Sequence, residues 1–333
     1  MVGLCCLSRQ CWGGHRVTKK QDNQGGNKHA GHPLIWLLGQ PHLGDYLSFV
    51  ETRVVGGHAM DKRKLADEWR AANDVYASLE ASEAGIADTI ECLPAGQKRA
   101  SQIAAVEANP WFQESFDNLP FSIEKVELDK LIVSQVHVEA SYAGDVEAKL
   151  RTKGGKCSDR ALFDFCLPLD RPSPPVRIQR LSTNRYLFAS PSTDFRSHDP
   201  RLLRGAEIAH LDSSGPVEAM FGVMIGFGSN FMSGVRSGNR VLLQNGYHRA
   251  FALRQAGFTH GWCAIETVTR KDELKLTASD EVAEDPEFYF AAKRPPILRD
   301  FLDPRLAKPL LVRGMETQIE VEIVIRSSTA TLY

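Results

Sequence analysis

The sequence of 333 residues predicts an α+β fold, in which a helical segment precedes a domain built on a mixed β-sheet. Apolar residues recur at helical spacing over 65–76, whereas β-branched residues with partial alternation fill 123–138. A short apolar strand at 239–243 then runs into a helix at 246–257, and a second strand follows at 259–268. That helix ends on a glycine, a residue type that often caps helices.

The composition is that of a soluble globular protein, with 43% hydrophobic and 24% charged residues. The net charge of −1 creates no global field that would attract nucleic acid or an anionic membrane. No apolar stretch is long enough for a transmembrane helix, and the N-terminus has no clear secretory pattern, so we expect a cytoplasmic protein with no membrane partner. Seven scattered cysteines do not resemble a disulfide framework, so we expect reduced thiols.

Residues 1–59 differ from the remainder of the chain. They contain two glycine pairs and polar residues without a clear period, whereas helical periodicity begins abruptly after Met60. Met60 would also be a plausible first residue. We therefore expect 1–59 to be either a misannotated upstream extension or a loosely ordered tail, and the sequence leaves the two open.

The rest of the chain divides into three parts. A helical segment covers 60–120, and Pro110 ends its regular helix because proline disfavours helix in the residue before it. The sheet domain covers 121–270. The last part, 271–333, is a C-terminal extension in which alternating apolar residues at 318–325 predict a final strand.

A loop-rich region lies inside the sheet domain. The stretch 176–190 predicts a β-hairpin, because two apolar runs flank Ser182-Thr183-Asn184. The stretch 201–210 predicts a short helix that leads to a strand. The apolar stretch 217–227 predicts a buried helix that runs into a glycine-rich turn.

The feature that carries chemistry is the strand–turn–helix sequence LLQNGYHRAFALRQAG at 242–257. Gly246 tolerates a tight turn and lets another atom approach the backbone closely. The first turn of a helix presents N–H groups without intrahelical partners next to the positive end of the helix dipole, and this geometry binds phosphate. The predicted phosphate site consists of Asn245, Gly246, Tyr247, His248 and Arg249.

Two of these side chains add charge and proton chemistry. Arg249 can make a bidentate contact with a phosphate group. His248 can donate a hydrogen bond or move a proton near neutral pH, which makes it the candidate catalytic residue. The alternative is a structural turn, in which the helix is capped and Arg249 pairs with a local carboxylate.

The five residues from Asn245 to Arg249 resemble the signature turn of the ParB/sulfiredoxin-like superfamily. That turn reads Gly-Gly-Cys-His-Arg in sulfiredoxins and resembles Asp-Gly-His-His-Arg in related free-serine kinases. The stretch 126–135 is also similar to the first strand of the fold, so the resemblance spans about 123–268. It implies a ParB/sulfiredoxin-like domain that holds a nucleotide, such as ATP with Mg, through Gly246, His248 and Arg249.

Two departures narrow the function that the resemblance implies. Tyr247 occupies the position of the cysteine nucleophile of sulfiredoxins, and a phenol cannot form the thiol intermediate that sulfinic acid reduction requires, so the protein is not expected to be a sulfiredoxin. ParB proteins continue into a helix-turn-helix domain, whereas the residues after Val268 are acidic and broken by proline. DNA is therefore not a favoured partner.

A second loop could close over a ligand. The glycine-rich segment 226–240 supplies Ser229 and Asn230, and a polar loop supplies Asp194 and Arg196. Such side chains could act as a general base or hold a metal bound to nucleotide phosphates. A flexible connection and an ordinary solvated loop explain the two segments as well.

No metal held by the protein itself is expected. His260 with Cys263, and Cys11 with His15, have loose metal-ligand spacing. Neither pair has the second pair that a zinc site needs. The favoured partner is thus a nucleotide or another phosphate-bearing small molecule, and the sequence leaves the oligomeric state open.

The sequence therefore favours a phosphate- or nucleotide-binding protein, and it leaves open whether the protein is an enzyme. Phosphoryl transfer and nucleotide hydrolysis are the reactions that such a turn would serve, because both depend mainly on positioning and charge stabilisation. The alternative, from a different class, is a non-catalytic DNA-associated or regulatory binding protein of the ParB type.

Overall fold

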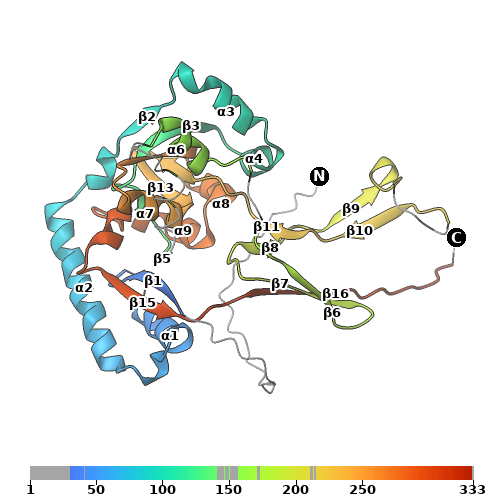
Figure 1. Ribbon diagram of the computed structural model, residues 1–333, viewed down its shortest axis with the longest axis horizontal. Coiled ribbons are helices and arrows are strands. Elements are labelled where there is room, and N and C mark those ends of the chain that lie inside the picture. The colour runs from blue at the N-terminus through green and yellow to red at the C-terminus, as the bar shows by residue number, and fades with distance from the viewer. Residues whose placement is uncertain are drawn as a thin grey trace. The chain divides into compact units, whose positions relative to one another are not determined.

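The computed structural model describes residues 31–331, with the exception of 41, 141–145, 147–149, 151–156, 171–172, 211–212 and 214. It has the mixed helix and strand content that the sequence predicts, with several separate sheets (Figure 1). Within the described residues, no helix is both long and apolar enough to cross a membrane. The described residues form two compact units: unit 1 combines those up to 169 with 230–313, and unit 2 combines those of 170–229 with those from 314 onward.

A six-stranded mixed sheet forms the centre of unit 1, in the order β2-β3-β14-β12-β13-β4. β14 pairs antiparallel with β3 and parallel with β12, while β13 pairs antiparallel with β12 and parallel with β4. β13 and β14 confirm the two strands predicted around the turn. The strands are Cys92–Pro94 (β2), Phe121–Glu127 (β3), Ile132–Val133 (β4), Ser233–Ser237 (β12), Arg240–Asn245 (β13) and His260–Val268 (β14).

Helix α7 (Tyr247–Gln255) follows β13 and confirms the predicted helix. Ala250, Phe251 and Leu253 are completely buried, so this face of the helix belongs to the main core. Gly257 adopts a φ of +88° just beyond the helix, as expected for a glycine that ends one. The later helices of unit 1 are α8 (Leu274–Thr277), α9 (Asp280–Glu284), α10 (Pro286–Phe290) and the 3-10 helices η5 (Lys271–Glu273) and η6 (Leu298–Leu302).

The predicted helical segment is present as separate helices. α2 (Lys62–Ser82) is the long one, and Asp61 caps it by accepting from the Arg63 N–H group at 2.8 Å. Asn109 caps the helix that begins at Pro110 in the same way. The other helices of the predicted segment are η2 (Ile86–Thr89), η3 (Gln97–Arg99), α3 (Ala100–Glu107) and α4 (Pro110–Ser115). Further along unit 1 lies α6 (Asp159–Cys166).

A second, three-stranded antiparallel sheet of unit 1 contains the N-terminal part of the described chain. Its order is β15-β1-β5, and Figure 1 shows α2 running beside β1 and β15. Trp36 of β1 and Tyr46 of α1 are buried in one cluster with Leu65 and Tyr76 of α2. The elements are His32–Leu37 (β1), Leu43–Arg53 (α1), Gly57–Ala59 (η1), His137–Glu139 (β5) and Ala307–Val312 (β15).

Residues 31–59 are therefore packed into unit 1 and are not a loosely ordered tail. Their apolar side chains at Leu34, Trp36 and Val50 have at most 4% exposure, and burial of this kind is what holds a short strand and helix in place. The pattern is missed in the sequence because β1 is buried through long-range pairing. Residues 1–30 lie outside the described residues.

Unit 2 consists of small antiparallel sheets. The predicted hairpin at 176–190 is confirmed as β6 and β7, and the predicted final strand is confirmed as β16, which pairs with β7. Two further pairs are β8 with β11 and β9 with β10. The elements are Arg177–Arg180 (β6), Arg185–Ser190 (β7), Phe195–Ser197 (β8), Arg201–Arg204 (β9), Gly205–Glu207 (η4), Ala219–Gly222 (β10), Ile225–Phe227 (β11) and Thr317–Glu322 (β16).

The helix predicted at 217–227 is wrong, because this stretch forms β10 and β11. Gly222 and Gly226 weaken a helix, and strand partners in β9 and β8 take up the backbone groups instead. At 201–210 the order of elements is reversed: the strand β9 comes first and η4 follows. The domain boundaries also differ, since 170–229 inside the predicted sheet domain belongs to unit 2.

Candidate functional site

The predicted turn lies at the junction of β13 and α7. Gly246 adopts a φ of +93°, and a Cβ atom there would lie 3.1 Å from the Cγ atom of Met232. Asn245 Oδ1 accepts a hydrogen bond from the Gly246 N–H group at 2.8 Å. Gly246 is the N-cap residue of α7 and has no side chain to cap it. The positive φ favours glycine, and a side chain here would also press on Met232.

His248 is held by the neighbouring strand β5. Its Nδ1 atom accepts the backbone N–H group of Glu139 at 2.9 Å. The neutral ring therefore carries its hydrogen on Nε2, which is a donor. Burial lowers the pKa of His248, while the Glu139 carboxylate opposes this shift. The imidazole is consequently poised as a neutral hydrogen-bond donor at neutral pH.

A second histidine lies close to the first. His137 precedes Glu139 on β5, and its ring stacks on the indole of Trp36. Burial lowers the pKa of His137 to about 4, and His248 and Arg53 contribute to the same shift. Within the described part of the chain, its buried Nδ1 atom has no hydrogen-bond partner. The site thus contains two imidazoles that stay neutral under ordinary conditions.

Tyr247 points into the core rather than toward a ligand. Its hydroxyl group donates to the carbonyl oxygen of Leu243 and lies 2.9 Å from Ser134 Oγ. Only 5% of the residue is exposed, and burial raises the pKa of its phenol. Tyr247 therefore fastens the turn to β13 and to the segment after β4.

Arg249 is also buried, with 6% exposure. Its Nη1 atom donates to the carbonyl oxygen of Cys166 at 2.6 Å, and Nη2 donates to the backbone oxygen and Oδ1 of Asn230 at 2.9 and 2.6 Å. The Phe165 ring lies over the guanidinium carbon at 5.7 Å. These contacts are with the protein, so Arg249 has a structural role, as in the alternative stated above, but its acceptors in these contacts are carbonyl and amide oxygens and not a local carboxylate.

The remaining predicted residues separate into two groups. Asn230 reaches the turn, because its side chain accepts from Arg249. Asp194 and Arg196 pair with each other in unit 2, and Ser229 is the last residue of the segment 170–229. The structure therefore brings one member of the predicted second loop to the turn within unit 1.

The described residues contain no group of three or more His, Cys, Asp or Glu side chains that could hold a metal ion. His260 pairs with Glu91 at 2.9 Å, and Cys263 is buried in the core. Burial also raises the pKa of the Cys166 thiol to about 11, so this cysteine stays protonated despite the nearby Arg249. Cys11 and His15 lie outside the described residues.

The C-terminal part of unit 1 contributes residues that the sequence analysis missed. Gln244 Nε2 donates to Thr277 Oγ1 at 3.0 Å, which places the end of α8 beside the end of β13. Glu281 on α9 accepts from the Tyr289 hydroxyl group at 3.1 Å. Glu281 is exposed to solvent on one side, yet desolvation by the surrounding protein raises the pKa of its carboxyl group, and the negative charge of Asp45 raises it further. No local pattern marks these residues, because only long-range packing brings them to the turn.

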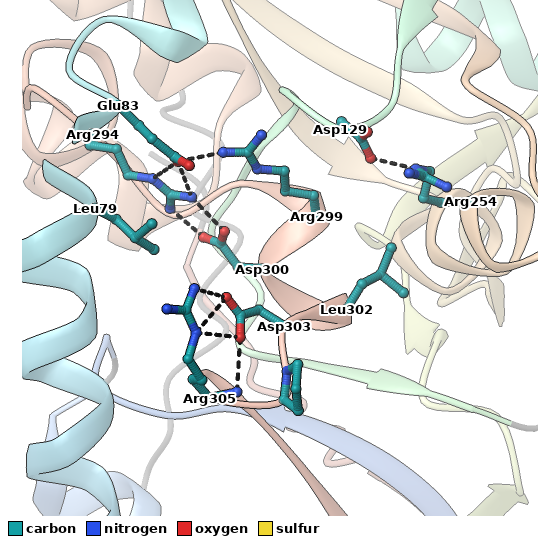
Figure 2. A pocket seen from close by; sticks show the side chains of 11 residues that line it. Leu79, Glu83, Asp129, Arg254, Arg294, Arg299, Asp300, Leu302, Asp303 and Arg305 are labelled. Carbon is teal, nitrogen blue, oxygen red and sulfur yellow. Dashed lines mark hydrogen bonds and ion pairs between the residues drawn. The ribbon is translucent and has the colours of Figure 1, made fainter.

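A pocket of about 460 Å³ lies elsewhere in unit 1 (Figure 2). Arg254 lies near the C-terminal end of α7, away from the turn, and it lines the pocket together with its partner Asp129. The arginines and carboxylates that line the pocket are equal in number and form ion pairs, so the pocket offers no net charge to an anion. The lining residues are Leu79, Glu83, Asp129, Arg254, Arg294, Arg299, Asp300, Leu302, Asp303, Pro304 and Arg305.

Comparison with known proteins adds no relative: no protein-family model, no curated protein and no solved structure matches the chain. The functional assignment therefore depends on the geometry of the turn and on the resemblance of its five residues.

Proposed function

We propose that the turn 245–249 binds the phosphate group of a nucleotide or of another phosphate-bearing small molecule, in a domain of the ParB/sulfiredoxin-like type. The observation that supports it most is the start of α7. Gly246, in its left-handed conformation, follows a buried strand and is the N-cap residue of a nine-residue helix, where it offers no side chain to cap the first turn. The first-turn N–H groups and the helix dipole favour an anion at such a position.

The side chains have different roles in this proposal. The backbone N–H groups of the first turn hold the phosphate oxygens, and His248 adds a hydrogen bond from Nε2, whose hydrogen is fixed by the contact of Nδ1 with Glu139. Arg249 positions the turn through Cys166 and Asn230 instead of binding the ligand directly. Proton transfer by His248 would extend binding to phosphoryl transfer or nucleotide hydrolysis.

The ligand class follows from the family resemblance of the turn. ATP or another nucleotide is the ligand that the family resemblance implies. Because no described cluster of three ligands could hold a metal ion, Mg would arrive coordinated by the nucleotide phosphates and would neutralise part of their charge. Binding should therefore be stronger with Mg than without it.

Isothermal titration calorimetry with inorganic phosphate, ADP, ATP and GTP, each with and without Mg, tests the proposal. His248→Ala removes the Nε2 donor, and one hydrogen bond is worth about 0.5–1.5 kcal/mol, so affinity should fall roughly three- to tenfold. His260→Ala is the matched control, because His260 lies on β14 and pairs with Glu91. Absence of binding by all four ligands, or equal losses in both variants, would refute the phosphate site.

A further inference from the structure

The side chain of Arg249 donates hydrogen bonds to two segments of unit 1. Each segment lies next to a point where the chain passes between unit 1 and unit 2. Unit 1 ends its first part at Leu169 and resumes at Asn230, so the inserted segment 170–229 has two stems. Cys166 lies three residues before the first crossing, and Asn230 is the first residue after the second. Arg249 donates to both, at 2.6 Å to the Cys166 carbonyl oxygen and 2.6 Å to Asn230 Oδ1.

The two stems are also bonded to each other and to the central sheet. The Met232 N–H group donates to the same Cys166 carbonyl oxygen at 2.9 Å. The Met232 carbonyl oxygen in turn accepts from the Ala264 N–H group of β14 at 2.9 Å. The Cys166 carbonyl oxygen thus accepts from both the Met232 N–H group and the Arg249 guanidinium. All of these groups lie within unit 1.

Arginine suits this junction for a physical reason. A guanidinium group is planar and has five N–H donors in a fixed fork, so its two Nη atoms can serve two separate acceptors at once. Lysine has one ammonium group and cannot hold both stems with the same geometry. Bringing together the ends of a long inserted segment costs conformational entropy, and buried hydrogen bonds at the base offset that cost.

We infer that Arg249 clamps the base of the inserted segment 170–229 and couples it to the turn that begins α7. The clamp itself stands on the contacts above. The coupling rests on the proposed function: a ligand that orders the first turn of α7 also orders the helix end that carries Arg249. Phosphate binding should then tighten both stems.

Hydrogen–deuterium exchange of the full chain without ligand tests the clamp. In Arg249→Ala, peptides that cover 163–169 and 229–235 should exchange roughly tenfold faster than in the wild type. Arg249→Lys should restore only part of the protection. Arg254→Ala is the matched control, because it removes an arginine from the other end of the same helix and should leave both stems unchanged.

Asn230→Ala provides a second test in case Arg249→Ala does not fold. It removes the Oδ1 acceptor and keeps the Asn230 backbone oxygen, and it should also speed exchange at the Cys166 stem, which Arg249 joins to Asn230. Unchanged exchange at that stem in Asn230→Ala, or equal effects of Arg249→Ala and Arg254→Ala, would overturn the clamp.

The coupling is tested in the same experiment with ATP and Mg, and separately with inorganic phosphate, after calorimetry has measured binding. Slower exchange at both stems in the wild type, lost in Arg249→Ala, supports the coupling. Binding without any change at the stems overturns the coupling and leaves the phosphate site intact. Absence of binding refutes the proposed function and the coupling with it, while the clamp is still decided by the ligand-free measurements.

Discussion

Trp36 and His137 face each other across β1 and β5, and their rings stack with centroids 5.7 Å apart and planes 6° apart. His137, which lies close enough to His248 to feel its charge, is therefore supported by the strand β1. Phe49 of α1 packs on the same indole, with a centroid distance of 4.2 Å. The segment 31–59 is thus part of the wall behind the candidate site.

The first prediction concerns this support. Trp36→Ala should lower the free energy of unfolding by about 3–5 kcal/mol, because a side chain with 3% exposure leaves a large cavity. Trp36→Phe should cost less, since it keeps an aromatic ring against His137 and removes an indole N–H group that has no described partner. Chemical denaturation of the variants measures both. A chain that starts at Met60 should be less stable than the full chain, and an equal melting temperature would contradict the packing.

The second prediction follows from His137, whose pKa falls from 6.5 to about 4 on folding. Because the folded state disfavours protonation, this histidine contributes stability that is complete above about pH 6.5 and is lost as the pH falls through 4. At about 1.4 kcal/mol per pKa unit, the loss amounts to roughly 3 kcal/mol. His137→Phe should reduce the slope of unfolding free energy between pH 6.5 and 4. His248 shifts in the same direction, so some slope should remain. A variant whose slope equals that of the wild type would show that His137 does not control it.

The sequence predicts the turn well, because every signal for it is local. Strand residues before Asn245, a glycine at 246 and helix formers after it determine β13 and α7 without any distant contact. The hairpin β6–β7 is predictable for the same reason. The prediction of a helix at 217–227 is wrong because it rests on the apolar composition of this stretch alone. Pairing with β9 and β8 instead places its backbone in the strands β10 and β11.

The partners of the site residues are not predictable in this way. Glu139 orients His248 from 109 positions away along the chain, and Cys166 accepts from Arg249 across 83. No periodicity connects such residues. The role of Arg249 is the clearest example: its residue type suits a phosphate and a pair of carbonyl oxygens equally well, and only the packing of α6 beside α7 distinguishes them.

The third prediction compares the two glycines that flank α7. Gly257→Ala should cost about 1–2 kcal/mol, since its φ of +88° is unfavourable for a side chain while the space around it is open. Gly246→Ala should cost more, because the new Cβ would also press on Met232 Cγ at 3.1 Å. Urea denaturation measures both variants. Equal losses would mean that Met232 moves away without cost.

The last prediction concerns the ion pairs of the pocket in Figure 2. Asp300 is 2% exposed and accepts from Arg294 Nη1 and Nη2 at 2.5 and 2.6 Å, as well as from the Ile297 N–H group at 2.9 Å. Asp300→Asn would leave the charge of Arg294 in a buried environment with Glu83 as its remaining carboxylate partner, at 3.2 Å. Breaking a buried pair from one side costs about 3–5 kcal/mol.

Asp303 is the matched control for this change. It pairs with Arg305 at 2.6 Å in the same pocket, but the Arg305 side chain is 62% exposed, so water can replace the lost carboxylate. Asp303→Asn should therefore cost no more than about 1 kcal/mol. Thermal and chemical unfolding of the two variants should differ clearly, because the residue type, the substitution and the pocket are the same, whereas the burial of the ion pair differs strongly. Similar losses of unfolding free energy in the two variants would show that solvent reaches the Arg294–Asp300 pair. The ion pairs of Glu83, at the end of α2, with Arg294 and with Arg299 of η6 would then contribute little to stability.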